Sequence, residues 1–172
     1  FLHLDAWLKK NKIVGLTGLD TRSLTNFIRD KGAPKGTIAF SKKQKFNISK
    51  LTNTTLKWSG LKNLDLAKDV STPKNYIWKG FKTWKKKDGF VKNKKNQFHV
   101  VAIDYGIKKN ILRYFSDFNC KVTVVHCKTS AEKILSLKPN GIFLSNGPGD
   151  PAATGKYAIN IIKNLIKKNI PI

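Results

Sequence analysis

The stretch GIFLSNGPGDP, residues 141–151, begins as a short apolar run and ends in a turn rich in glycine and proline. Its first residues have the nearly continuous apolar character of a strand that is covered on both faces. Pro148 fixes its own φ and disfavours helical backbone at Gly147, and neither Gly147 nor Gly149 has a Cβ to block close approach. The stretch predicts a buried strand, then a sharp turn, with Pro151 in the first turn of a helix or in a further turn.

Two further strand-and-helix pairs precede this stretch, and a helix follows it. Each predicted strand is a short apolar run, and each predicted helix carries apolar residues at helical spacing. The strands are 99–104, 121–126 and 141–145, the helices are 107–118, 130–139 and 157–168, and 170–172 starts a fourth strand. Strict alternation of this kind predicts right-handed crossovers and a parallel sheet with helices on both faces, which is an α/β fold.

The first half of the chain has weaker patterns. Apolar spacing predicts a short helix near residues 4–8 and a helix at 21–31, which Asp20 or Thr21 caps and Gly32 ends. A strand or extended run is expected at 12–16 and a strand at 36–40. Residues 46–56 are compatible with a helix and 63–71 with a short structured turn.

Residues 74–96 combine many lysines with interleaved aromatic residues. One interpretation is a basic surface on which nucleic-acid bases stack. The other, which we favour, is a pair of strands with a buried apolar face, followed by a solvated lysine-rich linker at 85–97. The predicted organisation is therefore a first domain at 1–84, the linker at 85–97 and a second domain at 98–172.

The chain carries a formal net charge of +24, from 34 basic and 10 acidic residues among 172. Only Arg22, Arg29 and Arg113 are arginine, whereas phosphate and guanine sites favour the planar fork of arginine. Lysine spread along every segment indicates a compositional bias rather than a specific nucleic-acid site. No apolar run is long enough for a membrane-spanning helix, so no membrane partner is expected.

Cysteine and histidine are few and poorly spaced for metal chemistry. Cys120 and Cys127 do not form a CxxC pair, and His126 beside Cys127 has no second pair at zinc spacing. We expect two reduced thiols, with neither a zinc site nor a disulfide. The chain begins at Phe1 and stops at Ile172 within a promising apolar segment, so we expect a fragment truncated at both ends.

Two loops leave the carboxyl ends of the predicted strands, where open α/β sheets bind ligands. In DYGIKKN, residues 104–110, Asp104 is placed to cap the next helix and Gly106 to allow the turn. In SNGPGDP, residues 145–151, the glycine amides suit an oxyanion or a carboxamide, although a plain strand-to-helix turn fits as well. Without GxxxxGK[ST], a nucleotide phosphate is not expected there.

Three blocks in this order resemble a known family: LDTRSLTNFIRDKGAPKGTI, DYGIKKNILR and GIFLSNGPGDP. The sequence resembles the small chains of glutamine-dependent carbamoyl-phosphate synthases over essentially all 172 residues. The resemblance implies a class I glutamine amidotransferase domain with a doubly wound, flavodoxin-like sheet, here incomplete. It also implies that the first half belongs to the mixed α/β domain peculiar to small chains.

The resemblance implies a cytoplasmic glutaminase that supplies ammonia to a large chain, which makes carbamoyl phosphate for arginine and pyrimidine synthesis. Gly147 and Gly149 match the glycines of the family's glutamine-binding loop. ATP and magnesium would belong to the large chain, and no cofactor is expected here. The partners implied are that large chain and glutamine, with no specific nucleic acid.

The family's chemistry uses a cysteine nucleophile in a GxCxGxQ motif, a histidine base and a glutamate that orients the base. This sequence contains no such motif, and the resemblance places all three residues beyond Ile172. Neither Cys120 nor Cys127 stands in a comparable turn, and no histidine here is assigned as the base. We therefore expect no catalytic residue within these 172 residues, and no glutamine hydrolysis by them alone.

Overall fold

The computed structural model describes residues 2–172. The chain forms two compact units, Phe1–Gly60 and Leu61–Ile172. Within residues 2–172, no helix combines the length and the apolar character needed to cross a membrane.

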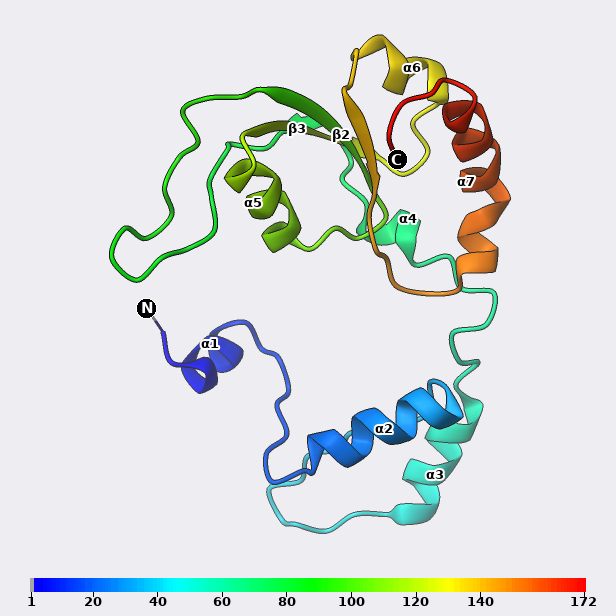
Figure 1. Cartoon of the computed structure of the whole chain (residues 1–172). Helices are drawn as coiled ribbons and strands as arrows, with labels where there is room; N and C mark the ends of the chain where they lie inside the picture. Colours follow the sequence, from blue (N-terminus) through cyan, green and yellow to red (C-terminus); the bar gives the residue numbers. More distant parts are fainter. Residues whose placement is uncertain (1) are drawn as a thin grey trace. The chain divides into compact units, whose positions relative to one another are not determined.

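The first unit contains three helices, α1 (Leu4–Lys10), α2 (Thr21–Lys31) and α3 (Ile48–Lys57) (Figure 1). The first two were predicted, and the sequence of the third was compatible with a helix. The Asp20 carboxylate accepts a hydrogen bond from the Ser23 N–H at 3.0 Å, so Asp20 caps α2, and the Asn47 side chain caps α3 in the same way. Gly32 follows the last turn of α2 with a φ of 80°, which favours glycine.

Neither of the two strands considered for the first unit forms, although an extended run was the alternative at 12–16. Residues 36–40 form no strand, and 12–16 is an irregular run with no ladder partner. Their apolar side chains stay exposed, as in Val14, Ile38 and Phe40. Neither segment finds a neighbouring strand in the described chain, and β-branched residues alone do not make a sheet.

The second unit is built on a four-stranded sheet with the order β1-β3-β2-β4. Strand β2 (Phe98–Asp104) lies in the middle and pairs in parallel with both β3 (Cys120–His126) and β4 (Gly141–Leu144). Ala102 stands opposite Val124 on one side and Phe143 on the other. The three predicted parallel strands are confirmed. The α/β architecture, a mixed open sheet, agrees with a class I amidotransferase fold.

Helices cover both faces of this sheet, as the alternation predicted (Figure 1). Helix α5 (Lys109–Asp117) packs on one face, where Leu112 joins Val100, Ala102 and their neighbours. Helices α4 (Ala67–Val70), α6 (Ala131–Ser136) and α7 (Pro151–Ile166) contribute to the core on the other face. Alternate residues of β2 therefore enter different cores, which explains its continuous apolar run.

A short strand, β1 (Tyr76–Ile77), lies antiparallel to β3 at one edge of the sheet. The strands of residues 98–172 are all parallel, as predicted, and this antiparallel edge strand is added by residues that precede them. It comes from the segment for which a strand pair and a base-stacking surface were both considered. Arg113 of α5 lies between the rings of Trp78 and Phe90, at 5.9 and 4.5 Å from their centroids, so these aromatic rings already contact a cation of the chain.

The expected linker, residues 85–97, continues a small hairpin in this structure. Isolated bridges join Phe81 to Lys92 and Lys85 to Gly89. Asp117 of α5 holds the hairpin, because its two carboxylate oxygens accept from the Thr83 N–H and hydroxyl at 3.2 and 2.6 Å. Residues 61–97 lie within the second compact unit. The domain boundaries expected from the sequence stay a prediction.

The last residues, 170–172, form no named strand, contrary to their prediction. One backbone hydrogen bond nevertheless ties them to the sheet, because the Ile142 N–H donates to the Pro171 carbonyl at 2.8 Å. Helix α7 begins at Pro151, six residues before the predicted start at Tyr157. The Asp150 side chain caps it by accepting from the Ala152 N–H at 2.9 Å.

Candidate functional site

The two glycine-containing loops meet where the chain reverses its direction of winding across the sheet. The second parallel strand, β3, lies on one side of β2 and the third, β4, on the other. Ligands of doubly wound sheets bind at this point, beyond the carboxyl ends of the strands. The loop after β2 contains Tyr105 and Gly106, and the loop after β4 contains Gly147 and Gly149.

Glycine is required where these loops touch. A Cβ on Gly147 would collide with the backbone carbonyl of Tyr105. A Cβ on Gly106, whose φ is 122°, would lie 2.9 Å from Pro148 Cδ. The two loops therefore pack backbone against backbone, and an alanine at either glycine would force them apart.

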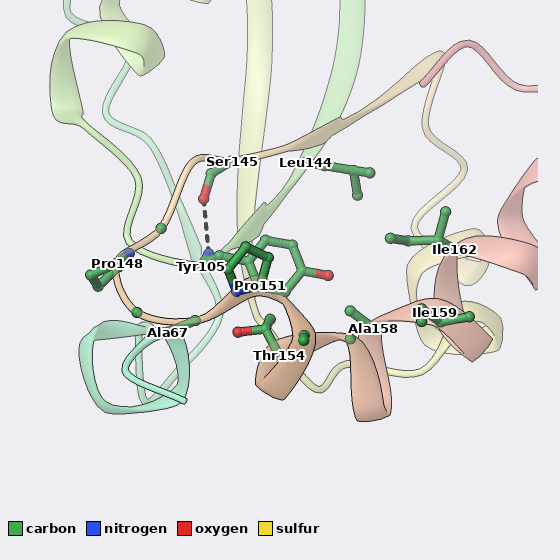
Figure 2. Close-up of a pocket in the computed structure, with 14 residues that line it drawn as sticks. Ala67, Tyr105, Leu144, Ser145, Pro148, Pro151, Thr154, Ala158, Ile159 and Ile162 are labelled. Atoms are coloured by element: carbon green, nitrogen blue, oxygen red, sulfur yellow. Dashed lines mark hydrogen bonds between the residues drawn. The ribbon is translucent and has the colours of Figure 1, made fainter. Parts of the chain in front are cut away.

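A pocket of about 390 Å³ opens beside this contact (Figure 2). The β4–α7 loop and the first turns of α7 form most of its wall, together with Tyr105 and Ala67. Its lining includes Leu144, Ser145, Gly147, Gly149, Thr154 and Ile162. Both residues that the sequence proposed for glutamine binding, Gly147 and Gly149, thus line one pocket.

The backbone amides of Gly147 and Gly149 make no hydrogen bond to another residue within 2–172. The Cβ side of each glycine is closed by protein, because Tyr105 lies against Gly147 and the Leu64 carbonyl lies 2.5 Å from a Cβ on Gly149. The loop is therefore held in place by packing while its amides stay free of partners. Free amides in a fixed turn are suited to an oxyanion or a carboxamide oxygen.

Tyr105 is a residue of this pocket that the sequence did not single out. Its N–H donates to Ser145 Oγ at 2.8 Å, which joins the two loops (Figure 2). Its ring is buried, and its hydroxyl has no hydrogen-bond partner among the described residues. Burial, with a smaller contribution from Cys127, raises the pKa of Tyr105 to about 12, so the hydroxyl stays protonated near neutral pH. It therefore remains a hydrogen-bond donor.

Asp104 holds the first loop. Its Oδ1 accepts from the N–H groups of Gly106 and Ile107 at 2.9 and 2.8 Å. The sequence had proposed that Asp104 caps the following helix. Helix α5 instead begins later, after Lys108, and has no side-chain cap. Asp104 therefore fixes the turn before the helix, because residues 105–108 separate it from the first residue of α5.

Cys127 lies at the end of β3, outside the pocket lining, and is completely buried. Its Sγ accepts from the Tyr157 hydroxyl at 3.6 Å and lies 3.9 Å from His126 Nδ1. Burial and the contacts with Cys127 and Asp65 raise the pKa of Tyr157 above its ordinary value. Cys120 is also a buried free thiol, and burial raises its pKa. Both thiols are packed groups, and neither meets the pocket.

No group of three or more His, Cys, Asp or Glu side chains within residues 2–172 is placed to hold a metal ion. The polar groups around the pocket are backbone amides and neutral hydroxyls, from Ser145, Thr154 and Tyr105. Such groups recognise an uncharged polar ligand group such as a carboxamide by hydrogen bonds.

Two families match separate parts of the chain. Residues 101–172 match the family described as glutamine amidotransferase class-I. Residues 2–38 match the carbamoyl-phosphate synthase small chain, CPSase domain. The first match contains both glycine loops and every lining residue of the pocket except Ala67. The second contains helices α1 and α2.

Curated relatives match the chain from end to end. It is 51% identical over 172 residues to the carbamoyl phosphate synthase small chain of Rhizobium meliloti. The aligned region covers 99% of this chain and 43% of that protein. It is 50% identical over 171 residues to the protein of the same name from Agrobacterium fabrum, with the same shares covered. The chain thus spans less than half the length of these relatives. By both kinds of similarity, the chain belongs to the carbamoyl-phosphate synthase small-chain family.

Proposed function

We propose that the protein is the glutaminase subunit of a carbamoyl-phosphate synthase. In this role it hydrolyses glutamine to glutamate and ammonia, and the ammonia is used by a large chain to make carbamoyl phosphate. The observation that carries the proposal is the pocket at the β2–β4 winding reversal, with the partner-free amides of Gly147 and Gly149 in its wall. Family membership gives this pocket its substrate class.

The pocket is suited to the side chain of glutamine in both size and chemistry. Its apolar part, which includes Leu144 and Ile162, matches the methylene groups of the ligand. The free glycine amides can donate to the carboxamide oxygen and, during attack, to the oxyanion that forms from it. Binding that strengthens as charge develops lowers the barrier of the chemical step.

The large chain, ATP and magnesium enter the proposal only through the family. We propose that the large chain binds ATP and magnesium, that this chain needs no cofactor, and that the pair works in the cytoplasm for arginine and pyrimidine synthesis. Ammonia is the only product that must pass between the subunits. Free ammonia in the medium would therefore bypass the glutaminase step.

The test uses the complete gene product together with its large chain. Glutamate release from glutamine is measured first, and then carbamoyl phosphate formation with glutamine or with an ammonium salt. The expected result is glutamine-dependent synthesis that is lost without the small chain, while synthesis from ammonium persists. Absence of glutamate release by the complete pair would overturn the proposal.

A second measurement uses residues 1–172 alone. The only thiols of this chain, Cys120 and Cys127, are both buried, so no thiol is available to attack a bound glutamine. We expect no glutamate release from this polypeptide. Release at a rate that depends on Cys127 would show instead that the buried thiol is the nucleophile.

A further inference from the structure

A segment that precedes the sheet in sequence crosses the carboxyl ends of its parallel strands. Residues 61–72, called the strap below, include α4 and lie beside the β4–α7 loop, where Ala67 reaches the pocket (Figure 2). The strap contacts the ends of β2 and β3, the β4–α7 loop and the start of α7. The sequence predicted only a short structured turn there.

Two aspartates fasten the strap near its ends, and they do so in the same way. Asp104 uses Oδ1 for its own loop and accepts with Oδ2 from the Thr72 N–H at 2.8 Å. Asp150 uses Oδ1 to cap α7 and accepts with Oδ2 from the Asn63 N–H at 2.8 Å. Each carboxylate therefore joins one glycine loop to one end of the strap.

The middle of the strap is also attached. Asp65 accepts hydrogen bonds from the hydroxyls of Thr154 and Tyr157 on α7, both at 3.2 Å. Ser71 Oγ accepts from the Cys127 N–H, at the end of β3, at 2.9 Å. These contacts keep the strap close to the sheet between its two fastened ends.

The strap is the wall behind the second glycine loop. The Asp150 N–H donates to the Leu64 carbonyl at 2.9 Å. The same carbonyl lies 2.5 Å from where a Cβ on Gly149 would stand, and the Leu66 nitrogen lies 2.9 Å from it. Gly149 has a φ of 90°, a conformation that residues with a Cβ rarely adopt. The strap therefore packs directly against the backbone of Gly149.

From this arrangement we infer that Asp104 and Asp150 are positioning residues for the glutamine loop and act through the strap. This inference rests on the proposed function of the pocket. Neither carboxylate lines the pocket. Each fastens the strap, and the fastened strap holds the Gly147–Gly149 amides in the orientation that binds the substrate. Release of either end lets the loop relax, which weakens binding without removing any group that contacts glutamine.

Asparagine at either position separates the two sets of hydrogen bonds that the carboxylate accepts, those within its own loop and the one from the strap. The single amide oxygen can keep the bonds of Oδ1, while the NH₂ group then faces the strap N–H and repels it. We expect Asp104→Asn and Asp150→Asn each to raise the KM for glutamine about tenfold, the effect of losing one hydrogen bond to a charged group. The rate of carbamoyl phosphate synthesis from ammonium should stay unchanged.

A strap-side variant tests the same link without altering either aspartate. Thr72→Pro removes the N–H group that donates to Asp104. Ser71, the residue before it, already has the extended backbone that a following proline requires. Asp117→Asn is the matched control, since Asp117 also accepts with both oxygens but binds the hairpin at Thr83. The Asp117 variant should leave the KM for glutamine unchanged.

A double variant distinguishes one shared strap from two local effects. If both aspartates act through the strap, Asp104→Asn with Asp150→Asn raises the KM by little more than either change alone. Independent local effects would multiply to about a hundredfold. Hydrogen exchange of the Asn63 and Thr72 amides reports directly whether each strap end has been released, and thermal unfolding confirms that each variant is folded.

The experiment is run on the complete gene product with its large chain. Faster exchange at Asn63 and Thr72 together with a raised KM and an unchanged ammonium rate supports the inference. Faster exchange with an unchanged KM overturns it, as does a fully multiplicative double variant. A wild-type pair that releases no glutamate would instead overturn the proposed function, before any variant is compared.

Discussion

The backbone carbonyl of Tyr105 occupies the place where a Cβ on Gly147 would stand. The two residues follow different strands, β2 and β4, and their loops are 40 residues apart at the Tyr105–Ser145 hydrogen bond. Their contact brings the two loops to one wall of the pocket. The glycine at position 147 is therefore a packing requirement as well as a candidate for substrate binding.

Replacement of Gly147 by alanine should destabilise the second unit. The added methyl group meets backbone, which cannot move aside as a side chain can, so we expect a loss of about 2 kcal/mol in the free energy of unfolding. Gly141→Ala is the control, because its Cβ would meet only the Pro171 carbonyl at an ordinary 3.7 Å. Urea denaturation followed by tryptophan fluorescence measures both. Equal stability of the two variants would contradict the described loop contact.

The Tyr105 hydroxyl has no partner among residues 2–172, whereas the Tyr157 hydroxyl has two, Asp65 and Cys127. Removal of an unpaired buried hydroxyl relieves a desolvation cost, so Tyr105→Phe should be neutral or more stable by about 1 kcal/mol. Tyr157→Phe removes the donor to Cys127 and one of the two hydroxyl donors to Asp65, and it should be destabilising. Thermal unfolding of the two variants at pH 7 provides the comparison, and the reverse order would refute it.

At high pH the same tyrosines should make the fold less stable. Burial raises the pKa of Tyr76, Tyr105 and Tyr157 above the ordinary value of 10.0. The folded state therefore keeps protons that the unfolded state loses, and this contribution is complete below pH 10 and is lost as the pH rises toward 12. We expect the free energy of unfolding to fall over that interval. Tyr105→Phe should make the fall shallower.

In acid, the carboxylates at the N-terminal ends of three helices should have the opposite dependence. Hydrogen bonds lower the pKa of Asp20 (from Ser23), of Glu132 (from its own backbone N–H, then from Ser130) and of Asp150 (from Asn63, then Ala152). Their stabilising contribution is present above the ordinary values of 3.8 and 4.5 and is lost as the pH falls through the lowered ones. Unfolding measured from pH 7 to pH 2 should show this loss. Asp150→Asn should reduce it for the second unit, with Asp117→Asn as the comparison.

The net charge of +24 predicts weak binding to any polyanion. Such binding should be independent of nucleotide sequence, have a steep salt dependence and vanish at physiological salt. Filter binding of single- and double-stranded DNA at two salt concentrations measures it. Tight, sequence-selective binding that survives physiological salt would favour the alternative of a nucleic-acid-binding module.

Local patterns were sufficient for the parallel strands and most helices. The apolar run at 99–104 predicted β2 because both faces of that strand are covered, and Asp20 and Gly32 marked the ends of α2 through local hydrogen bonds and backbone conformation. The winding order placed both glycine loops at one end of the sheet. These features depend on neighbours in sequence or on general rules of chain topology.

Other features depend on distant parts of the chain and could not be predicted from one sequence. The bond between Asn63 and Asp150 spans 87 residues, and that between Thr72 and Asp104 spans 32. A short apolar segment such as 36–40 becomes a strand only where another strand is available to pair with it. Tyr105 gave no signal of its own, because an aromatic residue after a strand is common and its unpaired hydroxyl is visible only in the structure.

The position of the strap along the chain has a consequence for biosynthesis. The strap and β1 leave the ribosome before the partners that fasten them, which lie at the ends of β2 and β3, in the β4–α7 loop and in α7. The helices α2 and α3 can form as soon as they emerge, because their N-terminal caps are local. The strap must wait for about 80 further residues, until Asp150 has been made. Before Asp150 is made, the nascent chain therefore carries formed helices followed by a strap whose first end is not yet attached. That end of the strap is among the last parts of the second unit to become fixed.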